Sequence, residues 1–398
     1  MRIVHVLHSH GYGGAESHAL LMMKLQREAG HEVCYAGPMD SWLGRECEKA
    51  GIACEHIPMH GLFDLPSHWK LRSLLKRLRA DIVHGHLIRG AMYAGRAGHH
   101  HRAPVAVCTA HATTARTHMQ RCAHIIAVSG AVRDGLLAAG YAERDVSLVY
   151  NGVPEGPPPP SPEQRAALRA ELGIPANAFA VAHVGRFVRD KGQDLLAQAM
   201  RSVPAGVHLY LIGDPATEFG REVQALLTAE PALAARVHCL GFRPDVQRLL
   251  PAFDAFALAS RREALSIAVI EAFAARVPVV ATRVGGVPEI VRHEDTGLLV
   301  PTEDAATLAQ GITRLSADAE RVLAALGEPL AAPYMVYSRS KSSDIQFAPF
   351  TDAAGRVHPN SVNLYESSYE ASSDTSVRRG AWASFSAGLK AYNHTYAA

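Results

Sequence analysis

One pattern occurs twice along the chain: short apolar runs alternate with longer amphipathic stretches, first over residues 1–153 and again over 177–325. Apolar runs bounded by turn residues indicate buried strands, and the amphipathic stretches between them indicate helices. We expect strands at residues 2–7, 33–36, 81–84, 105–109 and 124–128, and then at 179–184, 207–212, 237–240, 255–258, 277–281 and 297–300. Strands that alternate with helices pair in parallel and are covered on both faces. The pattern therefore predicts an α/β fold with two Rossmann-like, doubly wound parallel sheets.

Turn and proline residues mark the break between the two parts. Asn151 and Gly152 form a turn signal, and Gly156 is followed by four prolines, which keep a chain extended. After Leu326 the aliphatic alternation fades and Ser, Tyr, Asn and Gly dominate, so we expect an atypical, poorly ordered tail. The expected divisions are an N-terminal domain, a Pro-rich linker, a C-terminal domain and the tail, at residues 1–153, 154–176, 177–325 and 326–398.

Composition limits the classes of partner and the cellular location. A chain of 398 residues with 48% hydrophobic residues accommodates two cores, and a formal net charge of +2 gives no strong field for nucleic acid. The six cysteines form no C-x-x-C pair and are typical of reduced thiols in a cytoplasmic protein. The start of the chain is interrupted by histidines and glycines and reads as a first strand rather than a signal peptide. The protein is expected to work in water or on the inner membrane surface.

Two glutamates follow the run at 255–258, and ligands of such sheets bind beyond the carboxyl ends of the strands. Glu263 lies in a loop, and Glu271 lies in a helix expected at 266–275 with Ser266 as its N-cap residue. The amides of a helix N-terminus attract phosphate, and flanking carboxylates suit sugar hydroxyls. Alternatively, these are two surface acids, which are favourable near a helix start without any ligand.

Arg186 and Lys191 follow the run at 179–184 and precede a helix. Two cations in this position suit a diphosphate, whose negative charge grows when it leaves a broken glycosidic bond. The alternative is a solvated basic loop.

Three further segments follow expected strands of the first domain. Gly13 and Gly14 lie between a strand and a helix, where glycine lets backbone amides approach a ligand closely. Neither a G-x-G-x-x-G nor a Walker pattern is present. His111 lies just past the run at 105–109 and is placed to contact a sugar, although a lone histidine is more often structural. His84 and His86 are expected in the same kind of position with the same alternative.

No metal site is expected. The three consecutive histidines at 99–101 are poorly spaced for one ion and are interpreted as a solvated loop. The chain has no D-x-D pair, so a divalent cation held by paired aspartates lacks its ligands.

The stretch 69–79 is a basic amphipathic helix, with leucines on one side and Lys and Arg on the others. Packing of the leucines on the sheet is the first interpretation, and contact with an anionic membrane is the second.

Taken together, these segments resemble the GT-B glycosyltransferases, specifically the retaining family 4, in which two Rossmann-like domains face a central cleft. The resemblance covers residues 1–325, and its features occur in the family's order. They are Gly13-Gly14-Ala15-Glu16, His111, Asn151-Gly152-Val153, Gly185-Arg186 with Lys191-Gly192, Leu240-Gly241-Phe242, Glu263 with Glu271, and Gly285-Gly286-Val287-Pro288-Glu289. Each motif alone is weak evidence for the family, whereas the joint match of all of them in this order is specific to it.

The resemblance implies a reaction and a role for each matching residue. The chain would transfer a sugar from a nucleotide sugar, most commonly a UDP-sugar, to a glycan or lipid-linked acceptor without a cofactor or metal, in lipopolysaccharide or surface polysaccharide synthesis. Catalytic roles would fall to His111, Glu263, Arg186 and Lys191. The donor would be bound by these two cations and by Gly13, Gly14, Gly241, Phe242, Glu263, Leu265, Ser266 and Glu271. Glu271 would hold the ribose, and His111 would lie beside the transferred sugar.

Other functions remain open at this point. The same fold carries nucleotide-sugar epimerases, and a non-catalytic nucleotide-sugar binding protein is a further alternative. Two departures from the family pattern bear on these alternatives: Gly213-Asp214-Pro215 replaces a more glycine-rich turn, and the tail lacks a clear crossing helix, with residues 382–392 as a weak remnant.

Overall fold

The computed structural model describes residues 1–61, 63–114, 117–154, 158–317, 336–339 and 345–347. The chain divides into two compact units. Unit 1 comprises the described residues of 1–152 together with 337–339 and 345–347. Unit 2 comprises the described residues of 153–336. Each unit has its own sheet and its own core.

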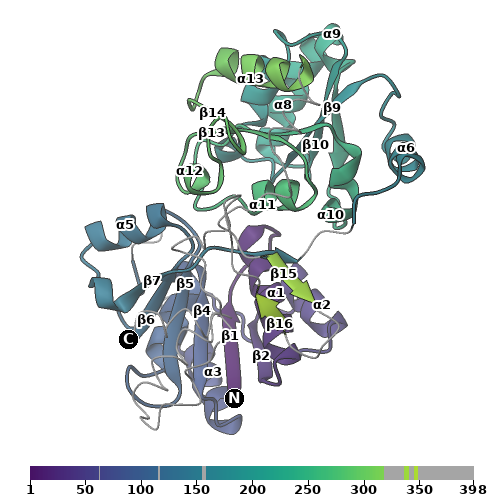
Figure 1. Ribbon diagram of the computed structural model, residues 1–398. Helices are drawn as coiled ribbons and strands as arrows, with labels where there is room; N and C mark the ends of the chain where they lie inside the picture. The colour runs from purple at the N-terminus through teal and green to yellow at the C-terminus, as the bar shows by residue number, and fades with distance from the viewer. Residues whose placement is uncertain (62, 115–116, 155–157, 318–335, 340–344, 348–398) are drawn as a thin grey trace. The chain divides into compact units, whose positions relative to one another are not determined.

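Unit 1 is built on a seven-stranded parallel sheet in the order β3-β2-β1-β4-β5-β6-β7 (Figure 1). Its strands are β1 (Arg2–Leu7), β2 (Glu32–Gly37), β3 (Ala53–His56), β4 (Ile82–His86), β5 (Val105–Ala110), β6 (His124–Ala127) and β7 (Val146–Leu148). The helices between them are α1 (Gly14–Glu28), α2 (Trp42–Lys49), α3 (Leu65–Arg77), α4 (Leu87–Ala97) and α5 (Gly130–Ala138), followed by the 3-10 turn η1 (Glu143–Asp145).

Unit 2 contains a six-stranded parallel sheet in the order β11-β10-β9-β12-β13-β14. Its strands are β9 (Phe179–Val184), β10 (Val207–Ile212), β11 (Val237–Gly241), β12 (Ala255–Leu258), β13 (Val279–Thr282) and β14 (Gly297–Val300), after the short β8 (Val153–Pro154). The helices and 3-10 turns are α6 (Pro162–Glu171), η2 (Arg189–Lys191), α7 (Gln193–Ala199), α8 (Glu218–Ala229), α9 (Pro231–Ala234), α10 (Val246–Leu249), η3 (Leu250–Ala252), α11 (Ile267–Ala274), α12 (Val287–Ile290) and α13 (Ala305–Ala317).

Strands β4, β5, β12 and β13 are buried along their whole length, as the sequence predicted for parallel sheets, whereas the edge strands β3 and β11 are partly exposed. Successive side chains of β1 point to opposite faces, so Val6 packs with Leu71 of α3 while Leu7 packs with Leu20 of α1. Both units therefore have the predicted α/β fold with a parallel sheet. No helix within the described ranges has the length and apolar character that a membrane span requires.

Two predicted boundaries differ in ways that matter for the candidate site. Gly13 and Gly14 do not both precede the first helix, because α1 begins at Gly14 and Gly13 is its N-cap residue. Strand β4 continues to His86, so His84 and His86 lie within the strand and not past its end. Polar residues are tolerated there because their rings find buried hydrogen-bond partners, such as the Thr109 hydroxyl 2.8 Å from His84 Nε2.

The segment expected to be a Pro-rich linker contains the helix α6. Ser161 and Gln164 form a reciprocal capping box, and proline occupies the first helical turn. The helix is fixed to its own unit because Arg165 and Arg169 both bind the Asp254 carboxylate, at 2.6 and 3.0 Å.

Near the C-terminus, β15 (Val336–Arg339) and β16 (Ile345–Phe347) form an antiparallel pair. The expectations for the rest of the tail, including the helix remnant at 382–392, lie outside the described residues.

Candidate active site

The sheet of unit 2 has a point where its strand order reverses. From β9 the chain moves outward to β10 and β11, and it returns to pair β12 with the other side of β9. The loops after β9 and β12 diverge from this point, which is where α/β sheets bind ligands. Lys191 follows β9 and Glu263 follows β12. All candidate residues of this unit follow strands that end at this same carboxyl edge.

Lys191 and Glu263 meet at this point. Lys191 Nζ lies 2.6 Å from Glu263 Oε1, and the Ser260 hydroxyl donates to the same oxygen at 2.8 Å. Glu263 is buried, whereas Lys191 is partly exposed. The predicted cation and the predicted carboxylate therefore form an ion pair, which the sequence did not indicate.

The two loops that carry this pair are also tied together by their neighbours. Asp190 accepts from the Arg262 guanidinium at 2.9 Å, and its carbonyl accepts from the Arg261 backbone N–H at 2.7 Å. Arg261 in turn donates to Asp194 of α7 at 2.8 Å. The loops that carry Lys191 and Glu263 are thereby held together.

Two glycines allow the backbones of this site to approach each other. Gly192 has φ +68°, and a Cβ on it would lie 2.0 Å from the Ala259 carbonyl oxygen. Gly285 has φ +52°, and a Cβ there would lie 1.8 Å from the Glu263 carbonyl oxygen. Only glycine fits these positions.

Gly285→Ala is expected to abolish transfer and to lower the free energy of unfolding by about 2 kcal/mol or more, because the new methyl group strains the backbone and pushes the Glu263 loop away. Gly206→Ala is the matched control, since a Cβ at Gly206 meets nothing within 4 Å. Urea unfolding and a transfer assay on both variants check this prediction. Wild-type turnover by Gly285→Ala would show that the Glu263 loop does not depend on this contact.

Glu271 lies in the second turn of α11 and not at its start, so it does not flank the helix N-terminus as predicted. Gln247 of α10 donates to its carboxylate at 3.3 Å. Burial raises the pKa of Glu271 to about 7, and the Gln247 bond opposes this rise. Ser266 is the N-cap residue, as predicted, but its hydroxyl makes no capping bond to α11. Leu265 and Ser266 are buried beside this uncapped helix start.

The remaining donor candidates of unit 2 also lie on the carboxyl edge. Arg186 is exposed, and among the described residues its guanidinium makes no ion pair. Gly241 has φ +71°, and its carbonyl accepts from the Gly213 N–H at 2.9 Å. Phe242 is 43% exposed. The structure thus joins Lys191 to Glu263 directly, and Arg186, Glu271, Gly241 and Phe242 lie on elements at or after the carboxyl edge of the same sheet.

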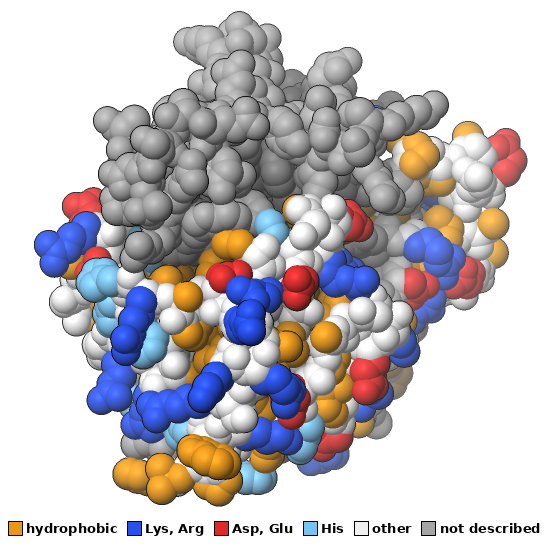
Figure 2. All heavy atoms as spheres, turned by 90° about the horizontal axis from the view of Figure 1, so that it is seen from below, with side chains coloured by type: hydrophobic (Ala, Val, Ile, Leu, Met, Phe, Trp, Pro, Cys, Tyr) orange, Lys and Arg blue, Asp and Glu red, His pale blue; other side chains and the backbone are white. Residues whose placement is uncertain are grey.

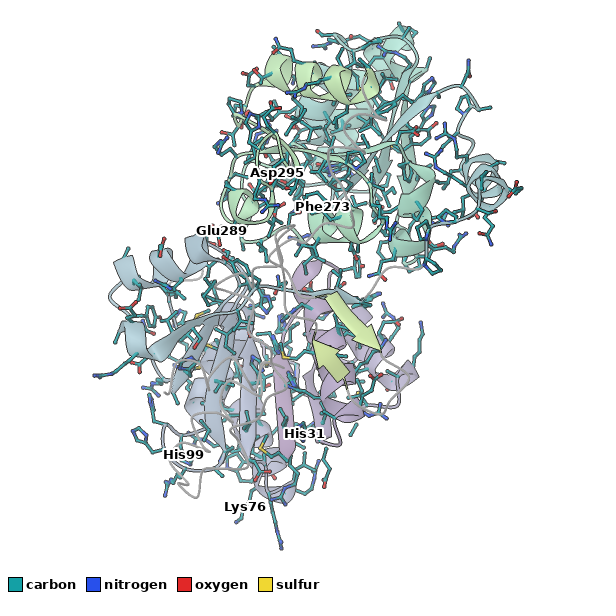
Figure 3. All side chains as sticks on the ribbon, viewed as in Figure 1. His31, Lys76, His99, Phe273, Glu289 and Asp295 are labelled. Carbon is teal, nitrogen blue, oxygen red and sulfur yellow. The ribbon has the colours of Figure 1, made fainter. Side chains whose placement is uncertain are left out.

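Unit 1 has a pocket at the corresponding edge of its own sheet. The strand order reverses between β1 and β4, and a cavity of about 510 Å³ lies beyond these strands. It is lined by His8, Gly61, Leu87, Ile88, Arg89, Met92, His111, Ala112 and His118. By contrast, His31, Lys76 and His99, which precede β2, β4 and β5, lie at the opposite, amino-terminal edge (Figure 3).

His111 therefore lines a pocket, and it also connects the pocket to the interior. Its Nε2 lies 3.2 Å from His86 Nδ1, and its ring contacts His18 of α1. Burial, with a smaller contribution from His18, lowers the pKa of His111 well below its ordinary range. The imidazole is neutral near pH 7 and acts through hydrogen bonds. Gly13 and Gly14 lie at the start of α1, next to the same sheet edge.

Sequence reasoning missed Arg89 and His8. Arg89 Nη1 lies 2.9 Å from His8 Nε2, donates to the Met59 carbonyl at 3.0 Å, and places a cation on the wall of the pocket. Both residues closely follow strands that meet at the reversal point of the sheet. Their positions shortly after these two strands could have identified both residues as site candidates from the sequence.

These features define the class of protein. The two parallel-sheet units constitute the GT-B fold, and the chain carries two glycosyltransferase domains. Residues 12–155 match the model described as Glycosyltransferase Family 4, and residues 178–318 match the model described as Glycosyl transferases group 1. The matched regions contain Lys191, Glu263, Glu271 and His111.

Similar proteins include curated glycosyltransferases of bacteria. The lipopolysaccharide core biosynthesis glycosyltransferase LpsD of Rhizobium meliloti is 35% identical over 44% of this chain and 48% of its own length. A D-inositol 3-phosphate glycosyltransferase of Mycobacteroides abscessus is 38% identical over 39% of this chain and 36% of its own. The chain thus matches less than half the length of these relatives.

Solved structures match over more of the chain. Anabaena HepE in complex with UDP-glucose has a TM-score of 0.73 and 25% identity, covering 83% of this chain and 93% of that one. The lipopolysaccharide glycosyltransferase WaaG has a TM-score of 0.63 at 18% identity, with 82% and 93% covered, and this likeness concerns the fold.

Proposed function

We propose that the chain is a retaining glycosyltransferase that moves a sugar from a nucleoside-diphosphate sugar to a glycan or lipid-linked acceptor. The observation that carries this proposal is the Lys191–Glu263 pair at the reversal point of the unit 2 sheet. A cation and a carboxylate at this reversal point, with an exposed arginine in the loop after β9, support a diphosphate site there. The complex of HepE with UDP-glucose supports a UDP-sugar as donor.

In this proposal the C-terminal unit stabilises the leaving group. Lys191 turns from Glu263 to the donor diphosphate, and Arg186 binds the same group, so that two cations offset the charge that develops as the glycosidic bond breaks. Glu263, released from Lys191, accepts from sugar hydroxyls, and Glu271 accepts from the ribose. Leu265 and Ser266 offer the amides at the start of α11 to the phosphate. Gly241 and Phe242 face the base.

The acceptor engages unit 1. The pocket lined by Arg89 and His111 is large enough for a sugar-sized group, and the neutral His111 offers a hydrogen bond to the transferred sugar. Gly13 and Gly14 lie at the start of α1 and offer backbone amides to the pyrophosphate. The acceptor attacks from the face that the diphosphate leaves, and the leaving phosphate takes its proton. No metal and no cofactor enter this sequence of steps.

The test is a thermal-shift screen with UDP-, GDP- and ADP-sugars in the absence of added metal, followed by a transfer assay with the donor that binds. Binding raises the unfolding temperature by mass action, and a UDP-sugar is expected to give the largest rise. Change of the donor sugar without any acceptor would favour an epimerase. Binding without turnover across acceptors would favour a non-catalytic binding protein.

We further propose that unit 1 contacts the inner membrane surface, where a lipid-linked acceptor resides. Leu71, Leu74 and Leu75 of α3 are buried in the core of the unit, but Phe63, Leu65 and Trp69 are 86, 73 and 79% exposed. Lys70 and Lys76 are exposed on the same helix. Figure 2 shows a face rich in Lys and Arg with hydrophobic side chains gathered at one rim. Gly61, two residues before Phe63, lines the pocket, so the apolar side chains lie near the proposed acceptor site.

This contact predicts binding to anionic phosphatidylglycerol vesicles. The variant Phe63→Ser/Leu65→Ser/Trp69→Ser is expected to bind at least about tenfold more weakly in cosedimentation, since each anchor contributes apolar burial. Lys70→Ser/Lys76→Ser should weaken binding to anionic but not to phosphatidylcholine vesicles. Unchanged sedimentation of both variants would contradict the proposed contact.

A further inference from the structure

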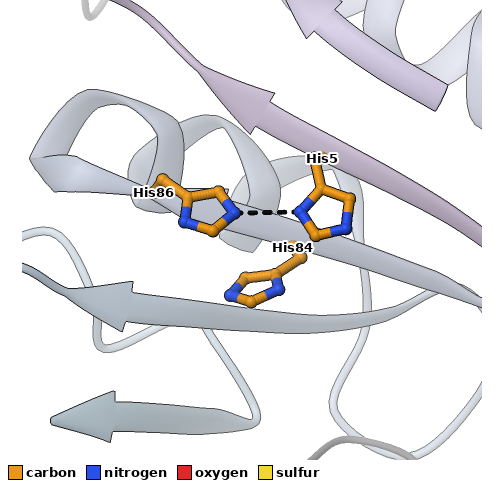
Figure 4. A group of neighbouring side chains, drawn as sticks. All are labelled: His5, His84 and His86. Carbon is orange, nitrogen blue, oxygen red and sulfur yellow. Dashed lines mark hydrogen bonds between the residues drawn. The ribbon is translucent and has the colours of Figure 1, made fainter. Parts of the chain in front are cut away.

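Three histidines in the interior of unit 1 have no role in the proposed transfer. His5 of β1 lies opposite His84 in the β1–β4 register, and His86 follows two residues later on the same face (Figure 4). All three are fully buried. One nitrogen of each ring lies within 4.8 Å of the others, and this is the one such group of potential metal ligands in the part of the chain that the structure describes.

Each ring also uses one nitrogen for a partner outside the group. His5 Nε2 lies 2.6 Å from Gln26 Oε1, and His84 Nε2 lies 2.8 Å from the Thr109 hydroxyl. His86 Nδ1 lies 3.2 Å from His111 Nε2. Imidazoles that bind metals are held in this manner, by a hydrogen bond from the nitrogen that does not face the ion.

Another pair of nitrogens faces inward. His5 Nδ1 and His86 Nε2 are 2.9 Å apart. Because the Gln26 oxygen only accepts, His5 carries its proton on Nε2, and its Nδ1 presents a lone pair that accepts from His86 Nε2–H. The two rings thus already aim nitrogen atoms at one another across a short gap in the interior of the group.

We propose that His5, His84 and His86 bind a divalent first-row transition ion, with Zn²⁺ as the representative. Three imidazoles without a carboxylate favour such an ion over Mg²⁺ or Ca²⁺, which prefer oxygen. With Zn–N bonds of about 2.0–2.1 Å in a tetrahedral site, ligand nitrogens are about 3.3 Å apart. His5 and His86 need only separate slightly, and rotation of the ring brings His84 in. The fourth position is left for water. This site is separate from the donor diphosphate, and no step of the proposed transfer passes through the ion.

Occupancy of the site would change the pocket. When the ion binds His86 Nε2, the proton of that nitrogen moves to Nδ1, which then donates to His111 Nε2 instead of accepting from it. His111 must move its own proton to Nδ1. Each ring remains neutral, and no proton is gained or lost by the pair. The metal would thus convert His111 Nδ1 from a hydrogen-bond acceptor into a donor.

The experiment uses the full chain, freed of metal by a chelator and then titrated with Zn²⁺ by calorimetry and with Co²⁺ by absorption spectroscopy. One ion per chain is expected, with ligand-field bands of a nitrogen-coordinated Co²⁺ ion. His5→Gln and His86→Gln should lose the ion, and Gln26→Leu should bind it about 10–100-fold more weakly. The matched control His99→Gln/His100→Gln/His101→Gln, in the surface loop of the same unit, should bind it normally.

X-ray absorption at the zinc edge on the wild-type protein gives a second reading that does not depend on the folding of variants. Scattering from three imidazoles is expected. The proposal is overturned if the wild-type chain takes up no ion, if His5→Gln and His86→Gln bind it as well as the wild type, if the 99–101 control loses it, or if the absorption spectrum shows other ligands.

Discussion

Lys191→Met is expected to abolish detectable transfer and to lower the free energy of unfolding by about 3 kcal/mol. Transfer is lost because the cation that meets the diphosphate is gone. Stability is lost because the Glu263 side chain, only 6% exposed, loses its cationic partner and retains the hydrogen bond from the Ser260 hydroxyl. This loss of unfolding free energy lies at the lower end of the range for a broken buried ion pair, because the Lys191 side chain is itself 23% exposed.

The double variant Lys191→Met/Glu263→Gln separates the two effects. It removes both charges together, so most of the lost stability should return while transfer stays absent. The matched control is Arg201→Met, which breaks the pair with Glu230 on the surface of the same unit and should cost less than about 1 kcal/mol. Urea unfolding gives the stabilities, and calorimetric titration with a UDP-sugar gives donor binding. A double variant as unstable as Lys191→Met would mean that the pair does not act as a unit.

The expected loss of stability could not be read from the sequence, which offered for Lys191 only a diphosphate contact or a solvated basic loop. The pattern placed Lys191 after one strand and Glu263 after another, and it correctly predicted both strands. It did not predict that two side chains 72 positions apart share one hydrogen bond. That contact depends on β12 returning beside β9, and strand order is not encoded in the periodicity of any single segment.

Unit 1 was predicted less completely for a different reason. The strand β4 was expected to end at His84, since polar residues normally mark the end of a buried run. Here the core contains a chain of hydrogen-bonded imidazoles, and the strand continues to His86. Partners for buried polar groups come from β1, α1 and the loop after β5, so local sequence could not reveal them.

The helix α6 has a local sequence signal for its start, although the four prolines before it led to the prediction of a linker. Ser161 followed three residues later by Gln164 is the pattern of a capping box, and Pro162 suits the first helical turn. The segment therefore carried the information for a helix. What sequence could not show is that Arg165 and Arg169 both bind Asp254, which fixes α6 to unit 2.

The pKa of Glu271, raised by burial from 4.5 to about 7, predicts how stability depends on pH. Between these two values the folded protein holds a proton on Glu271 that the unfolded chain has released, so the free energy of unfolding falls as pH rises through this window and then levels off above it. Glu271→Gln lacks this slope. At about pH 8 the variant should be more stable than the wild type, by up to about 3 kcal/mol, and at about pH 4 the two should be equal.

Donor binding should change in the opposite direction. A carboxylate that accepts from ribose hydroxyls is best ionised, so a UDP-sugar, whose diphosphate does not titrate near neutrality, should bind the wild type more tightly as pH rises to about 7. Glu271→Gln should lose about 1.5–3 kcal/mol of binding and most of this pH dependence, with little transfer remaining. Calorimetric titrations at several pH values on both proteins measure this. A variant that gains stability at high pH yet binds the donor normally would place Glu271 outside the donor site and leave its burial without a functional reason.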